Sequence, residues 1–240
     1  MTIVNPFRFK QFHVYDQMST MKVGTDAVLL GAWSRPPHTG NILDIGTGCG
    51  ILALMMAQKT NAEITAIDIH PQSVKQAFTN FSESPWKNRL NVLEISLESF
   101  SESNSGIFDF IISNPPFFIN SLKPSKNNLL IAKHADIDFP DIFFGSIFKL
   151  LKPEGKAAFI IPYPELETVL QKLVHTGLNP YRIAEVFGKS SSKPIRAMLE
   201  ITKDKALDIK RESIHIFNSD MSYSEKYKLL TNDFYLFLNQ

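Results

Sequence analysis

The sequence predicts an α/β fold in which a mostly parallel sheet carries helices on both faces. Short apolar runs that suit strands alternate along the chain with longer segments whose apolar residues recur at helical spacing. The run at 110–112 contains no polar residue, which is typical of a parallel strand buried on both faces. A glycine-rich turn separates the strand at 41–45 from a helix that begins at Ile51, as expected at the start of such an alternation.

The first half of the chain gives each element a local signal. Residues 7–12 alternate aromatic and polar side chains like an edge strand, and 27–33 read as a helix. After the glycine turn, the strand at 63–68 ends on the acidic residue Asp68, and Pro71 suits the first turn of the next helix. A third strand is expected at 90–95.

The second half continues the pattern. A helix from about 138 to 150 ends at the Lys-Pro-Glu-Gly sequence of residues 152–155, and a strand at 157–161 and a helix at 164–175 follow. Residues 181–187 and 195–201 are expected to form a hairpin, and 214–217 resemble another strand.

The strand at 110–112 leads into an unusual corner, Asn114-Pro115-Pro116-Phe117. Two consecutive prolines cannot continue a central strand, because each lacks the N–H that the ladder needs. The strand therefore ends at Asn114, at a carboxyl end of the sheet, where open α/β sheets bind ligands.

This corner suits transfer of a group to a planar amine. Such an amine is a poor nucleophile, and the side-chain oxygen of Asn114 and the carbonyl of Pro115 would accept both of its hydrogens. They would thereby offset the positive charge that the nitrogen gains as it attacks. Phe117 would stack on the ring that carries the amine, a contact worth roughly 1–3 kcal/mol for a base. The alternative is that Asn-Pro-Pro-Phe is only a turn.

The glycine turn is the second informative motif. Asp44 is followed by Gly46, Gly48 and Gly50, and the residue after them is Ile51. The dinucleotide fingerprint would need a glycine at position 51, which weighs against a nicotinamide oxidoreductase. Asp68 lies about 20 residues beyond the turn, where a carboxylate can accept hydrogen bonds from ribose hydroxyls.

Composition limits the partners and the compartment. The formal net charge of the 240 residues is +1, so any nucleic-acid site must be a local patch. The single cysteine, Cys49, excludes an intrachain disulfide and fits a reducing compartment. The first residues carry no apolar signal-peptide core, no run approaches the roughly 18 apolar residues of a membrane span, and no spacing of His and Cys suggests a metal site. We therefore expect a cytoplasmic protein that binds no membrane and no metal.

Two further regions are candidates for substrate contact. Residues 1–37 are expected to form an N-terminal extension or lid, and 38–240 the main domain together with the C-terminal tail. Residues 119–138 form a long polar stretch next to the corner, and 188–193 a basic hairpin tip. The basic residues of these regions that we expect to contact phosphate are Arg8, Lys10, Lys22, Lys123, Lys126, Lys133, His134, Lys189, Lys193 and Arg196.

Both motifs resemble those of S-adenosylmethionine-dependent methyltransferases. Asn-Pro-Pro-aromatic after an apolar strand is similar to the catalytic motif of the amino-group methyltransferases, and Asp-x-Gly-x-Gly-x-Gly resembles the first motif of the class I enzymes. The resemblance implies a Rossmann-like sheet of seven strands, six parallel and one antiparallel. It also implies that Asp44 and the backbone of Gly46–Gly50 hold the methionine moiety of the cofactor. Such relatives carry an acidic residue after the third strand for the adenine amine, and here the matching position is Ser96, so the Ser96 backbone or Glu98 would have to substitute.

The flanking sequences narrow the resemblance. Met21-Lys22-Val23-Gly24-Thr25-Asp26, the Leu-Leu-Gly-Ala-Trp that follows, and Asp233-Phe234-Tyr235-Leu236 in the tail resemble the bacterial tRNA(adenine-N6)-methyltransferases. That family modifies the adenine beside the anticodon of a valine tRNA. The resemblance implies a monomeric enzyme acting on tRNA, with Asn114, Pro115, Pro116 and Phe117 as catalytic residues. Three alternatives remain open: a ribosomal RNA guanine-N2 methyltransferase, a release-factor glutamine-N5 methyltransferase, and a non-catalytic nucleotide-binding adaptor.

Overall fold

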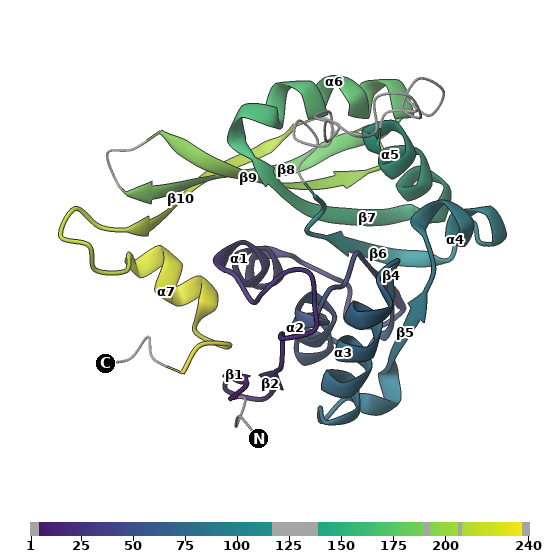
Figure 1. The fold of residues 1–240 in the computed structure, drawn as a ribbon. Helices are drawn as coiled ribbons and strands as arrows, with labels where there is room; N and C mark the ends of the chain where they lie inside the picture. Colours follow the sequence, from purple (N-terminus) through teal and green to yellow (C-terminus); the bar gives the residue numbers. More distant parts are fainter. Residues whose placement is uncertain (1–4, 117–138, 190–192, 206–207, 237–240) are drawn as a thin grey trace, which may run out of the picture.

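A central sheet of eight strands organises the described part of the protein, a computed structural model that covers residues 5–116, 139–189, 193–205 and 208–236. The strand order is β10-β8-β9-β7-β6-β3-β4-β5 (Figure 1). The strands are β3 (Asn41–Ile45), β4 (Glu63–Asp68), β5 (Leu90–Glu94), β6 (Phe108–Ser113), β7 (Leu151–Pro162), β8 (Asn179–Lys189), β9 (Pro194–Thr202) and β10 (Lys210–Phe217). A separate two-stranded sheet pairs β1 (Phe7–Arg8) with β2 (His13–Val14).

The sheet confirms the expected class I arrangement and extends it. Seven strands follow the predicted pattern, and among them only β9 runs antiparallel to its neighbours β7 and β8. An eighth strand, β10, pairs parallel to β8 and adds an outer edge that the seven-stranded expectation does not contain. The carboxyl ends of all strands except β9 therefore lie along one edge of the sheet.

Helices cover both faces of the sheet (Figure 1). One apolar cluster joins the sheet to α1 (Thr25–Trp33), α2 (Ile51–Lys59), α3 (Pro71–Ser82) and α7 (Glu225–Thr231). The other joins it to α4 (Leu97–Ser103), α5 (Phe139–Leu150) and α6 (Leu166–Thr176). Short 3₁₀ turns at Lys87–Arg89 and Tyr163–Glu165 complete the described elements.

Neighbouring residues of the central strands point into opposite clusters. Phe110 and Ile112 belong to the first cluster and Ile111 to the second, and all three are buried. This arrangement confirms that the apolar run at 110–112 is buried on both faces. It also fixes the strand, so that the corner that follows it is presented from a rigid element.

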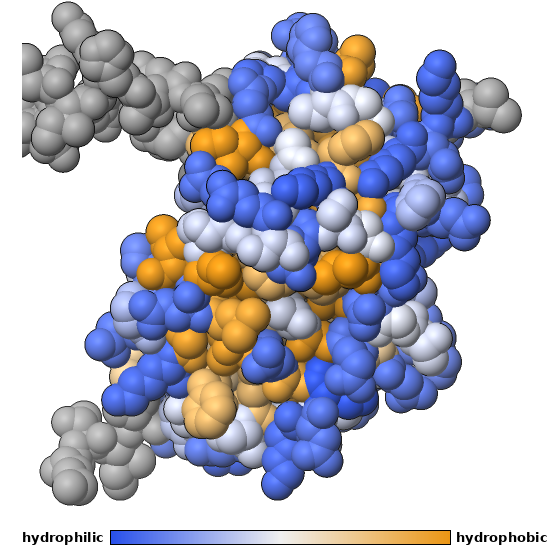
Figure 2. Space-filling view, turned by 90° about the vertical axis from the view of Figure 1, so that its right-hand side faces the viewer, coloured by the Kyte–Doolittle hydropathy of each residue, from blue (hydrophilic) through white to orange (hydrophobic). Residues whose placement is uncertain are grey.

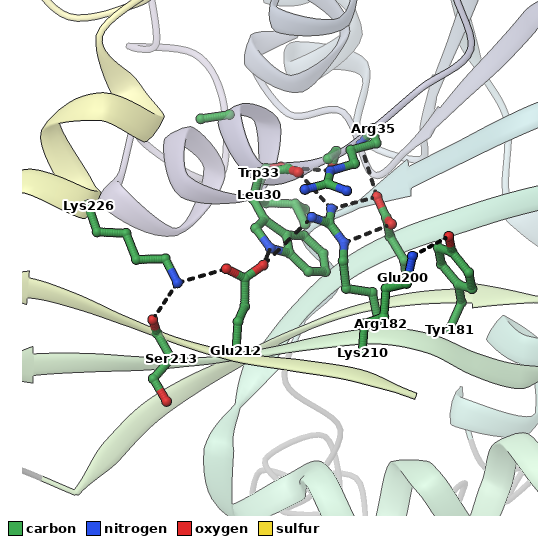
Figure 3. A network of polar contacts seen from close by, with 12 residues as sticks. Leu30, Trp33, Arg35, Tyr181, Arg182, Glu200, Lys210, Glu212, Ser213 and Lys226 are labelled. Atoms are coloured by element: carbon green, nitrogen blue, oxygen red, sulfur yellow. Dashed lines mark hydrogen bonds and ion pairs between the residues drawn. The ribbon is translucent and has the colours of Figure 1, made fainter. Parts of the chain in front are cut away.

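A polar network attaches α1 and α7 to the outer strands (Figure 3). The guanidinium of Arg182 stacks on the Trp33 ring, 3.7 Å from its centroid, and forms a buried ion pair with Glu200 at 3.0 Å. Glu212 on β10 accepts a hydrogen bond from the Trp33 indole at 2.8 Å and pairs with Lys226 of α7 at 2.8 Å. Because α1 shares its core with α2, residues 25–33 are part of the main body, and a closing role for residues 1–37 stays a proposal.

The opposite edge of the sheet is formed by β5, and apolar side chains lie at the surface among polar ones on this side of the molecule (Figure 2). Phe78 on α3 is 65% exposed there. No helix within the described ranges is long and apolar enough to cross a membrane. The described residues also contain no group of three or more His, Cys, Asp or Glu side chains that could hold a metal ion.

Candidate functional site

A cavity of about 530 Å³ opens at the carboxyl ends of the central strands. The adjacent strands β6, β3, β4 and β5 each deliver a chain segment to it, because parallel strands end at the same edge. Its lining residues are Thr20, Met21, Ile45, Gly46, Ile67, Asp68, Ile69, His70, Ile95, Ser96, Leu97, Glu98, Ser113, Asn114, Pro115, Pro116, Phe139, Ile142 and Phe143. The two sequence motifs thus meet in one cavity.

The Asn-Pro-Pro corner forms one wall. Ser113 pairs in register with Ile45, and its hydroxyl donates a 2.9 Å hydrogen bond to the Ile45 carbonyl, which ties the end of β6 to the start of the glycine turn. Asn114 is half-buried, Pro115 is buried and Pro116 is exposed. No hydrogen bond joins the Asn114 side chain to other residues within the described ranges, so its amide is available to a ligand. Phe117 lies outside the described residues.

The three glycines of the turn have different surroundings, although all have positive φ. Gly46 lines the cavity, and a Cβ added to it would meet nothing within 4 Å, so a ligand can approach its backbone closely. The N–H of Gly48 donates to Asp68 at 2.9 Å. Gly50 packs against Phe81, where an added Cβ would lie 2.5 Å from the ring. Gly50 is therefore required for packing of α2 on α3, and any cofactor contact by Gly50 stays a proposal.

Asp44 is a buried carboxylate with one unsatisfied oxygen. Its Oδ2 accepts from the Thr47 hydroxyl at 2.6 Å and from the Ala53 N–H at 3.1 Å. Its Oδ1 is buried and has no hydrogen-bond partner among the described residues. The pKa of Asp44 is raised to about 7, mainly by burial and to a smaller extent by the nearby charge of Asp68. The hydrogen bonds from Thr47 and Ala53 oppose this rise. A cationic group placed beside Oδ1 would satisfy the oxygen and favour the ionised form. Asp44 does not itself line the cavity, so its predicted contact with a methionine moiety stays a proposal.

Asp68 also organises the backbone of the site. One carboxylate oxygen accepts from the Gly48 N–H and the other from the His70 N–H, each at 2.9 Å. A carboxylate has about four acceptor positions, so these two bonds leave capacity for ribose hydroxyls. Asp68 lines the cavity, as the predicted role requires, and additionally fixes the turn that carries Gly46.

The third strand ends in apolar side chains and a helix cap. Ile95 and Leu97 line the cavity together with Ile67 and Ile69, which suits a flat aromatic base. The Ser96 hydroxyl accepts from the Ser99 N–H at 3.1 Å and caps α4. The Ser96 side chain is therefore engaged within the protein, whereas the carboxylate of Glu98 also lines the cavity.

Residues 13–23, here called the strap, are held over the site by contacts that no sequence pattern predicted. Thr20 and Met21 of the strap line the cavity. Two buried amides of α3 fasten it: Asn80 accepts from the Tyr15 N–H at 3.0 Å and donates to the Tyr15 carbonyl at 2.8 Å, and Gln76 accepts from the Met18 N–H at 3.2 Å. Asn80 also donates to the Cys49 carbonyl at 2.7 Å, which joins the strap to the glycine turn. What marks Asn80 and Gln76 is that they are polar residues buried on α3. Their burial is known only once the chain has folded, so sequence reasoning missed them.

The predicted basic residues that the structure describes do not form one cluster. Lys10 contacts Asn232 near the C-terminal tail, beside Arg8 of β1. Lys22 donates to the Asp16 carbonyl at 2.6 Å within the strap, and Arg196 pairs with Asp26 at 2.7 Å. Lys189 and Lys193 lie at the hairpin of β8 and β9. The remaining predicted contacts, Lys123, Lys126, Lys133 and His134, lie outside the described residues.

Cys49 is poorly placed to act as a nucleophile. It is buried in the turn, and burial raises the pKa of its thiol to about 11, so the reactive thiolate is suppressed.

The chain matches known proteins over nearly its whole length. Residues 18–135 match the family model of the methyltransferase small domain. A tRNA1(Val) (adenine(37)-N6)-methyltransferase from Phocaeicola vulgatus is 43% identical over 97% of this chain and 98% of its own length. The enzymes of the same name from Parabacteroides distasonis and Vibrio parahaemolyticus are 37% and 38% identical, over 98% and 96% of this chain and 99% and 95% of their own.

Solved structures share the fold at low identity. A predicted O-methyltransferase from Agrobacterium tumefaciens superposes with a TM-score of 0.68 at 15% identity, over 87% of this chain and 96% of its own. A ribosomal protein L11 methylase from Lactobacillus delbrueckii gives a TM-score of 0.52 at 19% identity, over 75% and 77%. These two show the fold alone. The sequence matches, together with the Asn-Pro-Pro corner and the Asp-Gly turn in one cavity, show that the chain belongs to the tRNA1(Val) (adenine(37)-N6)-methyltransferase family.

Proposed function

We propose that this protein transfers the methyl group of S-adenosylmethionine to N6 of an adenine in tRNA, the adenine beside the anticodon of valine tRNA. The observation that carries the proposal is the position of Asn114. Its amide lies at the wall of the cavity, fixed by the Ser113–Ile45 hydrogen bond and without a partner in the described structure. Relatives that match this chain over nearly their whole length bear the name of this activity.

The cavity fits the cofactor in three parts. Asp44 offers its unsatisfied oxygen to the methionine ammonium, Asp68 offers acceptor positions to the ribose, and Ile67, Ile69 and Ile95 offer an apolar slot to the adenine. When bound, S-adenosylmethionine supplies an electrophilic methyl group on a sulfonium. Binding on the backbone of Gly46 would place the methyl group near Asn114, because Ile45 and Ser113 are register partners.

Asn114 and Pro115 would act on the amine during transfer. The Asn114 side-chain oxygen and the Pro115 carbonyl accept the two amine hydrogens, which draws the nitrogen towards a tetrahedral shape and returns its lone pair from the ring. The same oxygens stabilise the positive charge that develops as the new N–C bond forms. As that bond forms, the bond between the methyl carbon and the sulfonium sulfur would break and leave a neutral thioether, and N6 would release a proton to solvent. Pro116 and Phe117 would complete the corner, and Phe117 would stack on the target base.

The substrate contacts and the compartment are proposals of the same kind. Lys22 lies in the strap next to Met21, which lines the cavity. Lys189, Lys193 and Arg196 lie at the hairpin of β8 and β9 on the same edge of the sheet. These four residues are therefore the described candidates for phosphate contact near the cavity edge. Lys123, Lys126, Lys133 and His134 lie outside the described residues and are candidates by sequence position alone. An enzyme of tRNA acts where tRNA is found, so we place the protein in the cytoplasm, acting as a monomer.

Replacing Asn114 by alanine should abolish methylation and leave cofactor affinity nearly unchanged, because the side chain acts on the amine in the transition state. Asn114→Asp keeps an acceptor oxygen and should retain part of the turnover. Asn88→Ala removes an exposed amide far from the cavity and serves as the matched control. Cofactor binding is measured by calorimetry, and turnover by transfer of label from the cofactor to tRNA.

The same assay separates the alternatives. Labelled cofactor is offered with total tRNA, ribosomal RNA or a release factor, and nucleosides from the labelled RNA are identified by mass spectrometry. N6-methyladenosine in tRNA is the expected product. Label found only in ribosomal RNA or only in the release factor would refute the proposal, and full turnover of Asn114→Ala would reduce the corner to a turn.

A further inference from the structure

We propose that the carboxyl ends of β8 and β10, together with the amino end of β9 next to β8, form a stacking platform for unpaired nucleotides of the RNA substrate. The platform consists of Phe187, Ile195 and His215. It rests on the proposed function, since it recognises the same RNA that is methylated at Asn114.

The three side chains lie on one face of the sheet. Val186 belongs to the core beneath α1, so the next residue, Phe187, points to the opposite face. His215 lies between Ile214 and Ile216 of that same core and likewise points away from it. Ile195 is two residues from Ala197, which belongs to the cluster on the opposite face. Alternation along three neighbouring strands thus brings all three side chains together.

The rings form a stacked pair. Phe187 and His215 are direct register partners on parallel strands, and their ring centroids are 4.5 Å apart with an angle of 25° between the planes. Neither ring belongs to a core cluster, both are only half-buried, and Ile195 is 44% exposed. The ends of these strands also extend beyond α6, which covers the same face further along the sheet (Figure 1). Aromatic surface is therefore presented where a helix would otherwise cover it.

The surroundings favour nucleic acid over an apolar partner. Lys189 is the last residue of β8, two positions after Phe187. Lys193 immediately precedes β9, two positions before Ile195. Arg211 lies on the same face of β10 as His215, because it stands four positions earlier and side chains alternate between the two faces along a strand. No hydrogen bond ties the imidazole of His215 to the described residues, but its Nδ1 is buried, so the ring offers a ligand only its remaining exposed surface. Aromatic rings on a sheet with cations around them are the usual means by which proteins stack bases of single-stranded RNA.

The platform lies within reach of the catalytic corner. β8 is separated from β6 by β9 and β7, so the two strands are three strand spacings apart across the sheet, about 14 Å. Along the strands, Phe187 lies four residues, about 13 Å, beyond Ile183, the residue of β8 that is level with Ser113. Both ends lie on the same edge of the sheet. A single RNA loop can therefore place its target adenine at Asn114 and neighbouring bases on the platform.

Binding of a fluorescent hairpin RNA that carries the valine anticodon loop tests the platform. Phe187→Ala should weaken binding by about fivefold or more, and the double substitution F187A/H215A by more than tenfold, while cofactor affinity stays at the wild-type value. Turnover at saturating RNA should recover. The salt dependence of binding should keep its slope in F187A, because no charge is lost, whereas Lys193→Ala should reduce the slope.

Matched variants separate stacking from packing. Phe187→Tyr keeps the aromatic face and should bind RNA like the wild type, and Phe187→Leu keeps apolar volume and should bind like Phe187→Ala. Phe78→Ala removes an exposed ring near the opposite edge of the sheet and should change nothing. The platform is overturned if Phe187→Leu binds RNA like the wild type, or if Phe78→Ala loses as much RNA affinity as Phe187→Ala. In either case, methylation of RNA by the wild type still upholds the proposed function. A wild type that methylates only a release factor overturns both.

Discussion

Replacing Asp44 by asparagine should make the cofactor-free protein more stable relative to wild type as the pH rises. The folded-state pKa of Asp44 is raised to about 7 from 3.8. Between these values the folded protein holds a proton that the unfolded chain has released, so the contribution of this group to the free energy of unfolding falls as the pH rises. It is fully present below about pH 4 and lost above about pH 7.

The size of the effect follows from the shift. About three pKa units at 1.36 kcal/mol each correspond to about 4 kcal/mol, and Asp44 is fully buried, so solvent screening does not reduce this figure. Asparagine keeps the shape and stays neutral. The free energy of unfolding of D44N minus that of wild type should therefore increase by about 2 kcal/mol between pH 5 and pH 7 and level off above about pH 8.

Urea denaturation of both proteins at half-unit pH steps measures this difference. Taking the difference cancels the titration of every group that the two proteins share. Thr47→Val removes the hydroxyl that bonds Asp44 and should raise its pKa, which moves the plateau to higher pH. A difference that does not vary with pH would show that Asp44 is already ionised in the folded protein at pH 5 and would refute the reasoning.

Two further predictions concern the cofactor. Asp68→Asn keeps an acceptor oxygen for one of the Gly48 and His70 N–H groups and removes the negative charge. The cofactor affinity measured by calorimetry should therefore fall by about 1–3 kcal/mol. Unchanged cofactor affinity in the folded variant would contradict the ribose role. Asn80→Ala leaves backbone groups of the strap and of the glycine turn without partners, so hydrogen exchange at 13–21 should accelerate and cofactor affinity should fall. The neighbouring Thr79→Ala is its control, and slow exchange in Asn80→Ala would show that the strap is held by other contacts.

The central part of the fold could be predicted because its signals are local. The apolar run at 110–112, the glycines after Asp44 and the acid at the end of β4 each determine their own surroundings through backbone chemistry. The parallel order then brings the ends of β3, β4 and β6 together without further information. This is why Asn114 and Asp68 could be assigned to one cavity from sequence.

The outer parts depend on long-range contacts that sequence patterns do not record. The segment at 214–217 looked like a strand, but its pairing with β8 as an eighth strand depends on the attachment of α7 through Glu212 and Lys226. Ser96 matched the position of a cofactor-binding residue, yet it lies one residue before α4 and its hydroxyl serves that helix. The strap depends on Asn80, a polar residue that lies on the buried side of α3.

The near-neutral charge of the protein makes stacking more important for RNA recognition. The net charge is only +1, and three of the described candidate cations, Lys10, Lys22 and Arg196, already contact protein oxygens. Phosphate contacts alone supply affinity that falls steeply with salt. Bases of an anticodon loop are partly unstacked before binding, so their transfer to protein rings costs less than extraction from a duplex. In this proposal the central strands bind the cofactor and the target amine. The outer strands bind the RNA loop by stacking, which depends little on charge.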